Sequence, residues 1–124
     1  MNDRFRFRIP ITDKYGKFKK FFYFDLFNQP AITCRASDIF QNVEQCTGLK
    51  DSAGKKIYEG DIVKRISKHD EEEPTVLLQI EWNNKGGRYI TTDKKHSTWT
   101  FSMFNYFYEV IGNIHENPEL LEDK

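Results

Sequence analysis

A chain of 124 residues is long enough for one domain with a modest apolar core, and 38% of its residues are hydrophobic. Eleven Phe, six Tyr and two Trp supply much of that apolar surface, because each aromatic side chain buries a large area. The apolar runs are shorter than a membrane span, and the first residues lack the apolar block of a signal peptide, so we expect a cytoplasmic protein.

The formal net charge is zero, yet the two halves of the chain carry opposite charges. Residues 1–56 contain eleven Lys or Arg and six Asp or Glu, whereas residues 57–124 contain eight and thirteen. Such halves can complement each other within one molecule or between two copies, and the basic half can also face an anionic partner. The charge pattern leaves these alternatives open.

The N-terminal residues predict a β-hairpin. The stretch RFRFRIPI, residues 4–11, first alternates arginine with apolar residues, a period of two that is typical of a half-buried strand. Turn residues follow at 13–17, and the aromatic run Phe18–Phe27 is expected to form the second arm. This arm is apolar on both faces, so either the rest of the monomer or a second copy of the chain has to cover it. A homo-oligomer is one of these two alternatives.

The segment after the hairpin predicts a short strand and a brief helix. Residues 31–35 follow a break at a proline and are expected to be extended. Ser37 is a suitable N-cap, and apolar residues at helical spacing predict a helix that ends near Gly48. Cys34 and Cys46 are too few and too widely spaced for a metal knuckle or a disulfide framework, so we expect free thiols.

The rest of the chain predicts further strands joined by turns. Strands are expected at residues 61–66, 75–82, 88–92, 98–101 and 104–111. A charged loop, Lys68–Pro74, separates the first two strands, and the glycine-rich residues 83–87 separate the next two. Near the end, Asn117 is expected to cap a short helical turn that begins at Pro118 and packs two leucines onto the protein.

The densest group of turn residues lies in QCTGLKDSAGKKIYEGDIV, residues 45–63. It fits either a ligand-binding loop or the corner of a small β-barrel. Asp51 suits the first position of a turn, and Gly54 can take the left-handed conformation that such turns often need. A carboxylate at Asp61, after the permissive Gly60, can accept backbone N–H groups and fix the bend into the next strand. Backbone geometry explains each of these residues, so the corner is preferred.

Two blocks of the sequence resemble the YopX family of small phage and prophage proteins. The first is TGLKDSAGKKIYEGDIV, residues 47–63, and the second is YEVIGNIHENPELL, residues 108–121. The resemblance implies an intracellular protein encoded by a phage or prophage, with an SH3-like small barrel in its C-terminal part. It implies no established activity, no cofactor and no catalytic residues.

Patterns that carry catalysis or metal binding are missing. The three histidines, His69, His96 and His115, are scattered through polar stretches without partners at helical spacing. Residues 70–73 are the only dense acidic cluster, and they lack the alternating oxygen ligands and the glycine of a calcium loop. Phosphate-binding and nucleophile motifs are also absent. We therefore expect no enzyme, no cofactor and no metal site, and a metal-dependent nuclease is a distant third hypothesis.

Basic residues interleaved with aromatic residues in the hairpin suit single-stranded nucleic acid, which needs both positive charge and stacking surfaces. Alternate residues on one strand face are roughly 6–7 Å apart, close to the phosphate spacing of a single strand. The candidate residues are Arg4, Arg6, Arg8, Lys19 and Lys20. An ordinary amphipathic strand gives the same pattern, and pairing of these arginines with the acidic half weakens the nucleic-acid hypothesis.

A protein partner or a second copy of the chain is the preferred hypothesis. Small barrels commonly bind partners in a groove between loops, although a fold does not determine a function. The candidate contacts are Tyr58, Trp82 and Trp99 with the loop Lys68–Pro74. These aromatic residues also suit positions in the core.

The predicted fold is mainly β, in the α+β class. An N-terminal hairpin and a short helix occupy residues 1–48, and they pack on an SH3-like barrel with a terminal helical turn in residues 49–124. The predicted function is that of a non-enzymatic phage accessory protein that acts by binding.

Overall fold

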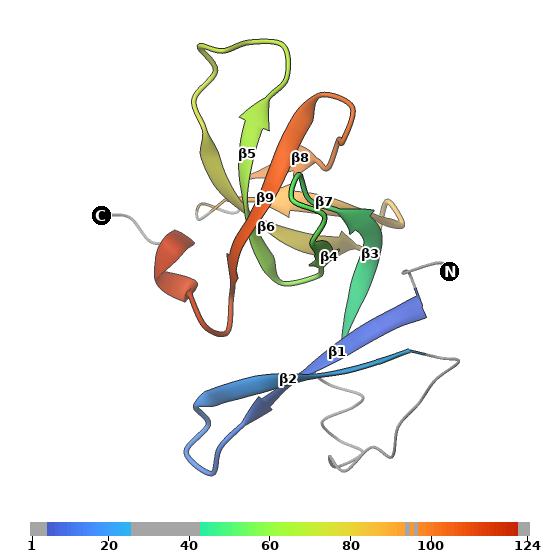
Figure 1. The fold of residues 1–124 in the computed structure, drawn as a ribbon, viewed down its shortest axis with the longest axis vertical. Coiled ribbons are helices and arrows are strands. Elements are labelled where there is room, and N and C mark those ends of the chain that lie inside the picture. Colours follow the sequence, from blue (N-terminus) through green and yellow to red (C-terminus); the bar gives the residue numbers. More distant parts are fainter. Residues whose placement is uncertain (1–4, 26–42, 94, 96, 122–124) are drawn as a thin grey trace.

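The computed structural model describes residues 5–25, 43–93, 95 and 97–121. Within these ranges the chain is mainly β, and nine strands form two curled antiparallel sheets (Figure 1). The strands are β1 Arg6–Thr12, β2 Phe18–Asp25, β3 Glu44–Lys50, β4 Lys56–Tyr58, β5 Asp61–Ser67, β6 Val76–Asn83, β7 Arg88–Thr92, β8 Thr98–Thr100 and β9 Tyr106–Asn113. A 3-10 helix, η2, covers Pro118–Leu121. The mainly β class predicted from the sequence is confirmed.

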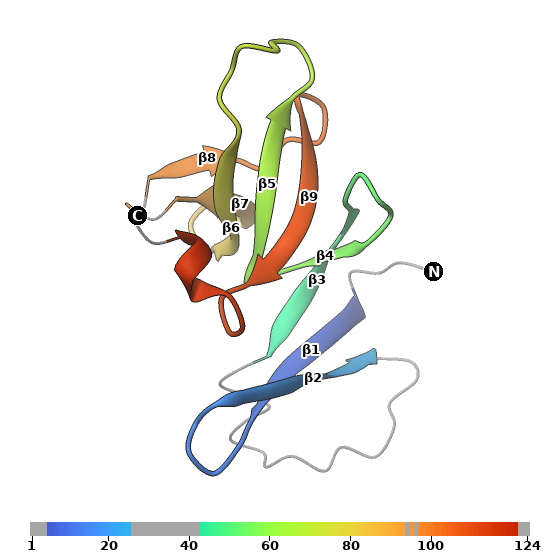
Figure 2. The same cartoon turned by 60° about the vertical axis from the view of Figure 1, so that its left-hand side comes forward.

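The first sheet has the strand order β2-β1-β3-β4, and its hairpin of β1 and β2 lies below the second sheet (Figure 2). This is the hairpin that the alternating N-terminal residues predicted. Arg8 lies opposite Tyr23 on β2 and opposite Glu44 on β3. The strand is not half-buried, however, because the consecutive residues Arg8 and Ile9 are only 3% and 0% exposed. On the arginine face of β1, Arg8 points toward the second sheet, where its guanidinium contacts Asp61.

The second sheet has the strand order β8-β7-β6-β5-β9, so that β5 pairs with β6 on one side and β9 on the other. Each strand predicted after residue 60 is present within two residues of its expected bounds. Strand β9 comes from the far end of the sequence, and its pairing with β5 curls the sheet upon itself (Figure 1).

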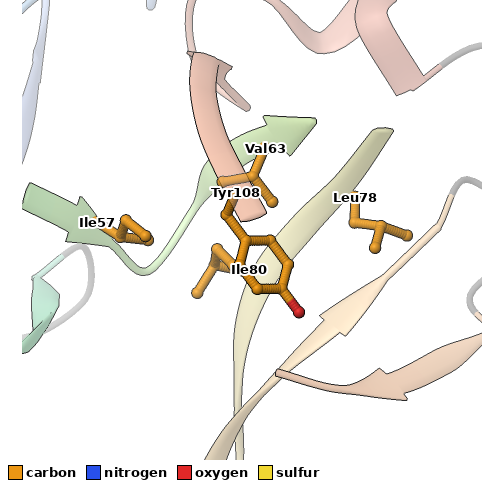
Figure 3. Close-up of a cluster of buried hydrophobic side chains, with 5 residues drawn as sticks. All are labelled: Ile57, Val63, Leu78, Ile80 and Tyr108. Atoms are coloured by element: carbon orange, nitrogen blue, oxygen red, sulfur yellow. The ribbon is translucent and has the colours of Figure 1, made fainter. Parts of the chain in front are cut away.

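The main core lies inside this curl (Figure 3). Its fully buried members are Ile57, Val63, Leu78, Ile80 and Tyr108. Four of these five residues come from β5, β6 and β9, where alternate side chains point to one face of the sheet. Each aliphatic side chain buried in this way contributes about 1.5–3 kcal/mol of transfer free energy.

The turn between β3 and β4 has the predicted conformation. The side chain of Asp51 accepts the N–H groups of Ala53 and Lys55 at 2.9 and 2.8 Å, and Gly54 takes a φ of +87°. The second carboxylate oxygen of Asp51 accepts the N–H of Val110 on β9 at 2.9 Å. The turn predicted at residues 51–54 is confirmed, and Asp51 also anchors it to the second sheet.

The helix predicted to end near Gly48 is wrong in the part that the structure describes. Residues Glu44–Lys50 form β3, and Gly48 within it has a φ of +86°. The helical spacing was misleading because β3 pairs with the distant strand β1 on one side and with β4 on the other, and these pairings decide the conformation. The first part of that helix, the strand predicted at 31–35 and Cys34 lie outside the described residues. Cys46 is fully buried on β3.

The end of the described chain folds back on the second sheet. As predicted, η2 begins at Pro118, and it lies against β6. The side chain of Asn117, predicted to cap this turn, accepts the N–H of Asn113 at 3.3 Å and so closes the loop that carries His115. Over the described ranges, no helix has the length and apolar character needed to cross a membrane.

Candidate functional site

A buried ionic network joins the two sheets, and Arg8 is its centre. The Nε atom of Arg8 lies 2.7 Å from Oε1 of Glu44, and Nη1 lies 2.9 Å from Oδ1 of Asp61. The Nη2 atom donates to the backbone carbonyl of Glu59 at 3.1 Å. All three nitrogens of the guanidinium thus have partners, and charge-assisted bonds of this kind are among the strongest in proteins.

Local structure explains the position of each partner. Pairing of β1 with β3 places Glu44 opposite Arg8. Asp61 opens β5, where its second oxygen accepts the N–H of Tyr58 at 2.8 Å. Gly60 has a φ of +88°, and a Cβ atom there would lie 2.6 Å from Oε2 of Glu44. The glycine is therefore required both by the backbone conformation and by the space that the carboxylate occupies.

The C-terminal tail and the hairpin aromatics complete the network. His115 Nε2 lies 2.7 Å from Oε2 of Glu44. The ring of His115 stacks on Phe18, with centroids 5.9 Å apart, and meets the edge of Phe21 at 5.7 Å. The guanidinium of Arg8 lies 4.0 Å from the centroid of Phe21. One cluster therefore connects β1, β2, β3, the start of β5 and the tail.

Burial shapes the ionisation of these groups. It opposes the charge of Arg8, but the attraction of Asp61 and Glu44 holds the pKa of Arg8 above its ordinary value. Burial raises the pKa of the Asp61 carboxyl, and the neighbouring Arg8 partly offsets that shift. Burial also raises the pKa of Tyr58 to about 12. Each charge is compensated inside the network, which suits a structural connection between the sheets.

An open cleft of about 650 Å³ lies beside this network. Its cations outside the network are Arg6 from the hairpin, Lys55 from the β3–β4 turn and Lys56 at the start of β4. The half-exposed ring of Tyr23 adds an aromatic wall. The remaining lining includes Arg8, Phe21, Gly54, Tyr58, Asp61, residues 110–113, Glu116 and Asn117. A cleft with this lining can bind an anionic group and a planar or apolar group side by side.

The residues predicted to bind nucleic acid do not form one accessible stripe. Arg4 lies outside the described residues, Arg6 lines the cleft, and Lys19 and Lys20 are exposed on β2. Arg8 is unsuitable as a contact to phosphate, because its guanidinium is buried and paired with Glu44 and Asp61. The sequence could not reveal this pairing, since both carboxylates are far from Arg8 along the chain.

The residues predicted to contact a protein partner are separated on the structure. Tyr58 is only 4% exposed and packs on Tyr23 and on the guanidinium of Arg8. Trp82 and Trp99 are 42% and 40% exposed, and they lie on β6 and β8. The loop Lys68–Pro74 is exposed except for a half-buried Glu73.

Several residues of the site were not expected from the sequence. Lys55 and Lys56 had been given no role in binding, and Asn113 and Asn117 had been assigned only to the chain end. Glu44 had been placed in a helix. The Lys55-Lys56 pair next to a tight turn was the one local signal, and it shows that a structural corner can also line a cleft.

Across the described ranges, no group of three His, Cys, Asp or Glu side chains is arranged to hold a metal ion. The fold and the cleft together define a small, mainly β protein with an open, partly basic cleft between two sheets.

This chain belongs to the YopX family, because the family model described as YopX protein matches residues 12–122. No curated protein matches the sequence. A solved structure, described as the crystal structure of protein EF1440 from Enterococcus faecalis, is similar with a TM-score of 0.51 and 25% sequence identity. The similarity covers 94% of this chain and 97% of that chain, so it extends over both sheets.

Proposed function

We propose that this protein is a phage- or prophage-encoded accessory protein of the host cytoplasm that has no enzymatic activity and acts by binding a protein partner. The cleft beside Arg8 carries this proposal. Arg6, Lys55 and Lys56 line the cleft near the half-exposed ring of Tyr23. An acidic segment of a partner protein that also carries apolar side chains matches this combination.

The non-enzymatic part of the proposal rests on the state of the buried ionisable groups. Arg8, Glu44 and Asp61 are engaged with one another, and His115 contacts Glu44. A catalytic acid or base needs a proton that it can exchange with a substrate. In this network the same groups hold the two sheets together.

The five-stranded sheet supports an SH3-like barrel as the scaffold. It is curled and antiparallel around one apolar core, and its strands are joined by loops such as Lys68–Pro74. Barrels of this kind present binding residues on rigid strands and variable loops.

The test uses a fluorescently labelled peptide of alternating glutamate and leucine, with binding followed by anisotropy. Replacing Arg6, Lys55 and Lys56 with Gln is expected to weaken binding at least tenfold. The matched control replaces Lys14, Lys17 and Lys85 with Gln, since these lysines are exposed elsewhere. Equal affinity of the two triple variants would contradict the proposal.

Single-stranded nucleic acid is the second candidate ligand, because Lys19 and Lys20 are exposed and Arg6 lies in the cleft near Tyr23. The same anisotropy assay with labelled oligo(dT) and oligo(U) over a salt series tests it. Binding whose log affinity falls steeply with log salt, and which the cleft variant loses, favours nucleic acid over the peptide.

Self-association is a third form of the binding function. Exposed apolar side chains such as Phe104 and Phe107, which are 81% and 48% exposed, could be covered by a second copy. The solution mass tests this form directly. A monomer across the accessible concentration range would leave the binding of a different protein as the proposed function.

A further inference from the structure

The structure contains a second buried arginine, Arg65 on β5, whose environment is the opposite of that of Arg8. Arg65 is 8% exposed, and its Nε atom is buried without a hydrogen-bond partner. In the part of the chain that the structure describes, no carboxylate lies within ion-pair distance of its guanidinium. Burying a cation without an anionic partner lowers stability.

Aromatic rings flank this guanidinium. The carbon at its centre lies 4.3 Å from the ring centroid of Tyr106 on β9 and 5.6 Å from that of Trp99 on β8. Cation–π contacts of this kind stabilise the guanidinium only in part, because the rings offer no oxygen atom that can accept its N–H groups. The rings hold the cation in place and leave its buried Nε–H group without an acceptor.

The position of Arg65 in the sheet makes it reachable. Strands β8 and β9 are the two edges of the five-stranded sheet, and Arg65 contacts a ring from each edge. All three residues of β8, Thr98–Thr100, are exposed. An exposed edge strand can pair with an added peptide strand. The seam between the two edges therefore combines an exposed edge strand with a buried cation beside Trp99.

We propose that this seam is a second binding site, in which Arg65 pairs with a carboxylate of an extended acidic peptide segment from a partner protein. The peptide lies along β8, and its carboxylate takes the place beside the guanidinium that Trp99 now shields. The planar fork of arginine matches a carboxylate with two parallel hydrogen bonds.

A carboxylate fits this seam better than a phosphate does. Among the described residues, Arg65 is the one cation in contact with both rings, whereas phosphate sites normally combine several donors. Glu73 Oε1 accepts a bond from the hydroxyl of Tyr106 at 3.3 Å, and a carboxylate in this position repels a doubly charged phosphate more strongly than a singly charged carboxylate. The half-buried Phe101 and Met103 pack on the adjoining core and offer apolar contacts to flanking side chains of a peptide.

This site is distinct from the cleft of the proposed function. Asp61 lines the cleft and Arg65 follows it four positions later on the same strand, a rise of about 13 Å. Neither site shares a lining residue with the other. One proposal can therefore fail while the other stands.

The fluorescence of Trp99 provides the test, in protein carrying Trp82→Phe so that one tryptophan remains. The probes are a capped peptide of alternating leucine and glutamate and its counterpart with glutamine. We expect a saturable change in Trp99 emission with the glutamate peptide, and at least tenfold weaker binding of the glutamine peptide. This comparison leaves Arg65 unchanged, so it does not depend on the folding of a variant.

Substitution then locates the interaction. Arg65→Met is expected to weaken binding of the glutamate peptide at least tenfold. Lys64→Met, on the neighbouring residue that faces the other side of the strand, is expected to leave it unchanged. The cleft variant with Gln at Arg6, Lys55 and Lys56 is also expected to retain this binding.

Three results would overturn the proposal. The first is the absence of a saturable change, or equal affinity for both peptides. The second is competition by inorganic phosphate at similar concentration, which would make the seam a phosphate site. The third is loss of binding in the cleft variant with Arg65 intact, which would place the peptide in the cleft and leave the proposed function standing.

Discussion

The guanidinium of Arg8 on β1 lies 2.9 Å from the carboxylate of Asp61 at the first position of β5. This pair connects the N-terminal hairpin to the five-stranded sheet. Glu44 and His115 extend the connection to β3 and to the C-terminal tail. Arg8 and Asp61 also form part of the lining of the cleft between the sheets, so their contact helps to fix the shape of that cleft.

The two buried arginines are expected to respond differently to the same substitution. Arg8→Met removes the cation from two buried carboxylates and should lower the free energy of unfolding by about 3–5 kcal/mol. Arg65→Met replaces a buried cation that has no carboxylate partner in the described chain, so the change should be below about 1.5 kcal/mol or stabilising. Urea unfolding of both variants measures the difference. An equal decrease in the free energy of unfolding for both variants would contradict the view that Arg8 has carboxylate partners and Arg65 has none in the described chain.

Glycines at positions 54 and 60 form a matched pair with φ values of +87° and +88°. Gly54→Ala should cost about 1 kcal/mol, because its Cβ meets nothing within 4 Å and only the backbone conformation is unfavourable. Gly60→Ala should cost at least about 2 kcal/mol, because its Cβ also displaces the carboxylate of Glu44. Thermal unfolding compares the two variants. Similar melting temperatures would show that the Glu44 side chain can move aside without lowering the stability of the protein.

Aspartates at two turns allow a similar comparison. The side chain of Asp51 accepts the N–H groups of Ala53 and Lys55 and also that of Val110 on another sheet. Asp51→Ala should therefore cost about 2–3 kcal/mol.

The control is Asp13, which accepts the N–H groups of Tyr15 and Lys17 within its own exposed turn. Asp13→Ala should cost about 1 kcal/mol or less, because those N–H groups can bind water. Chemical unfolding measures both variants. A loss for Asp13→Ala as large as that for Asp51→Ala would argue against the anchoring role of the bond to Val110.

Tyr58 should make stability depend on alkaline pH. Burial raises its pKa from 10.0 to about 12, so the folded protein keeps this proton where the unfolded chain has released it. Stability is therefore complete below pH 10 and falls as the pH rises from 10 toward 12. Tyr58→Phe removes this contribution and should give a shallower fall. Urea midpoints across that pH range test the prediction, and parallel profiles for the two proteins would refute it.

Much of the fold could be predicted because it depends on local patterns. The alternation in residues 4–9 and the turn residues after it identified the hairpin. Turn chemistry identified the corner at Asp51 and Gly54. The error at residues 44–48 has the opposite origin, since β3 is held by pairing with β1 and β4 on either side. Pairing between distant segments overrides the weak helical preference of a short stretch.

The candidate sites were harder to predict than the fold. The alternating pattern predicted that Arg6 and Arg8 lie on the same face of a strand. This is confirmed, because both residues line the same cleft. The pattern could not show that Arg8 meets two carboxylates while Arg6 lines an open cleft. It also gave no sign that Arg65 is buried between rings from both edges of the second sheet.

The sequence by itself determined that this protein is mainly β, where most of its strands lie, and that it belongs with the YopX family. The strand positions follow from side-chain periodicity and turn conformations, which act over a few residues. Membership of the family rests instead on two blocks of specific sequence and on the family model that matches residues 12–122. Only the tertiary structure decided which charges are paired, which are exposed, and which are buried without a partner. The energy of a charge depends on its burial and on neighbours brought close from distant parts of the chain, and the order of residues alone does not specify those neighbours.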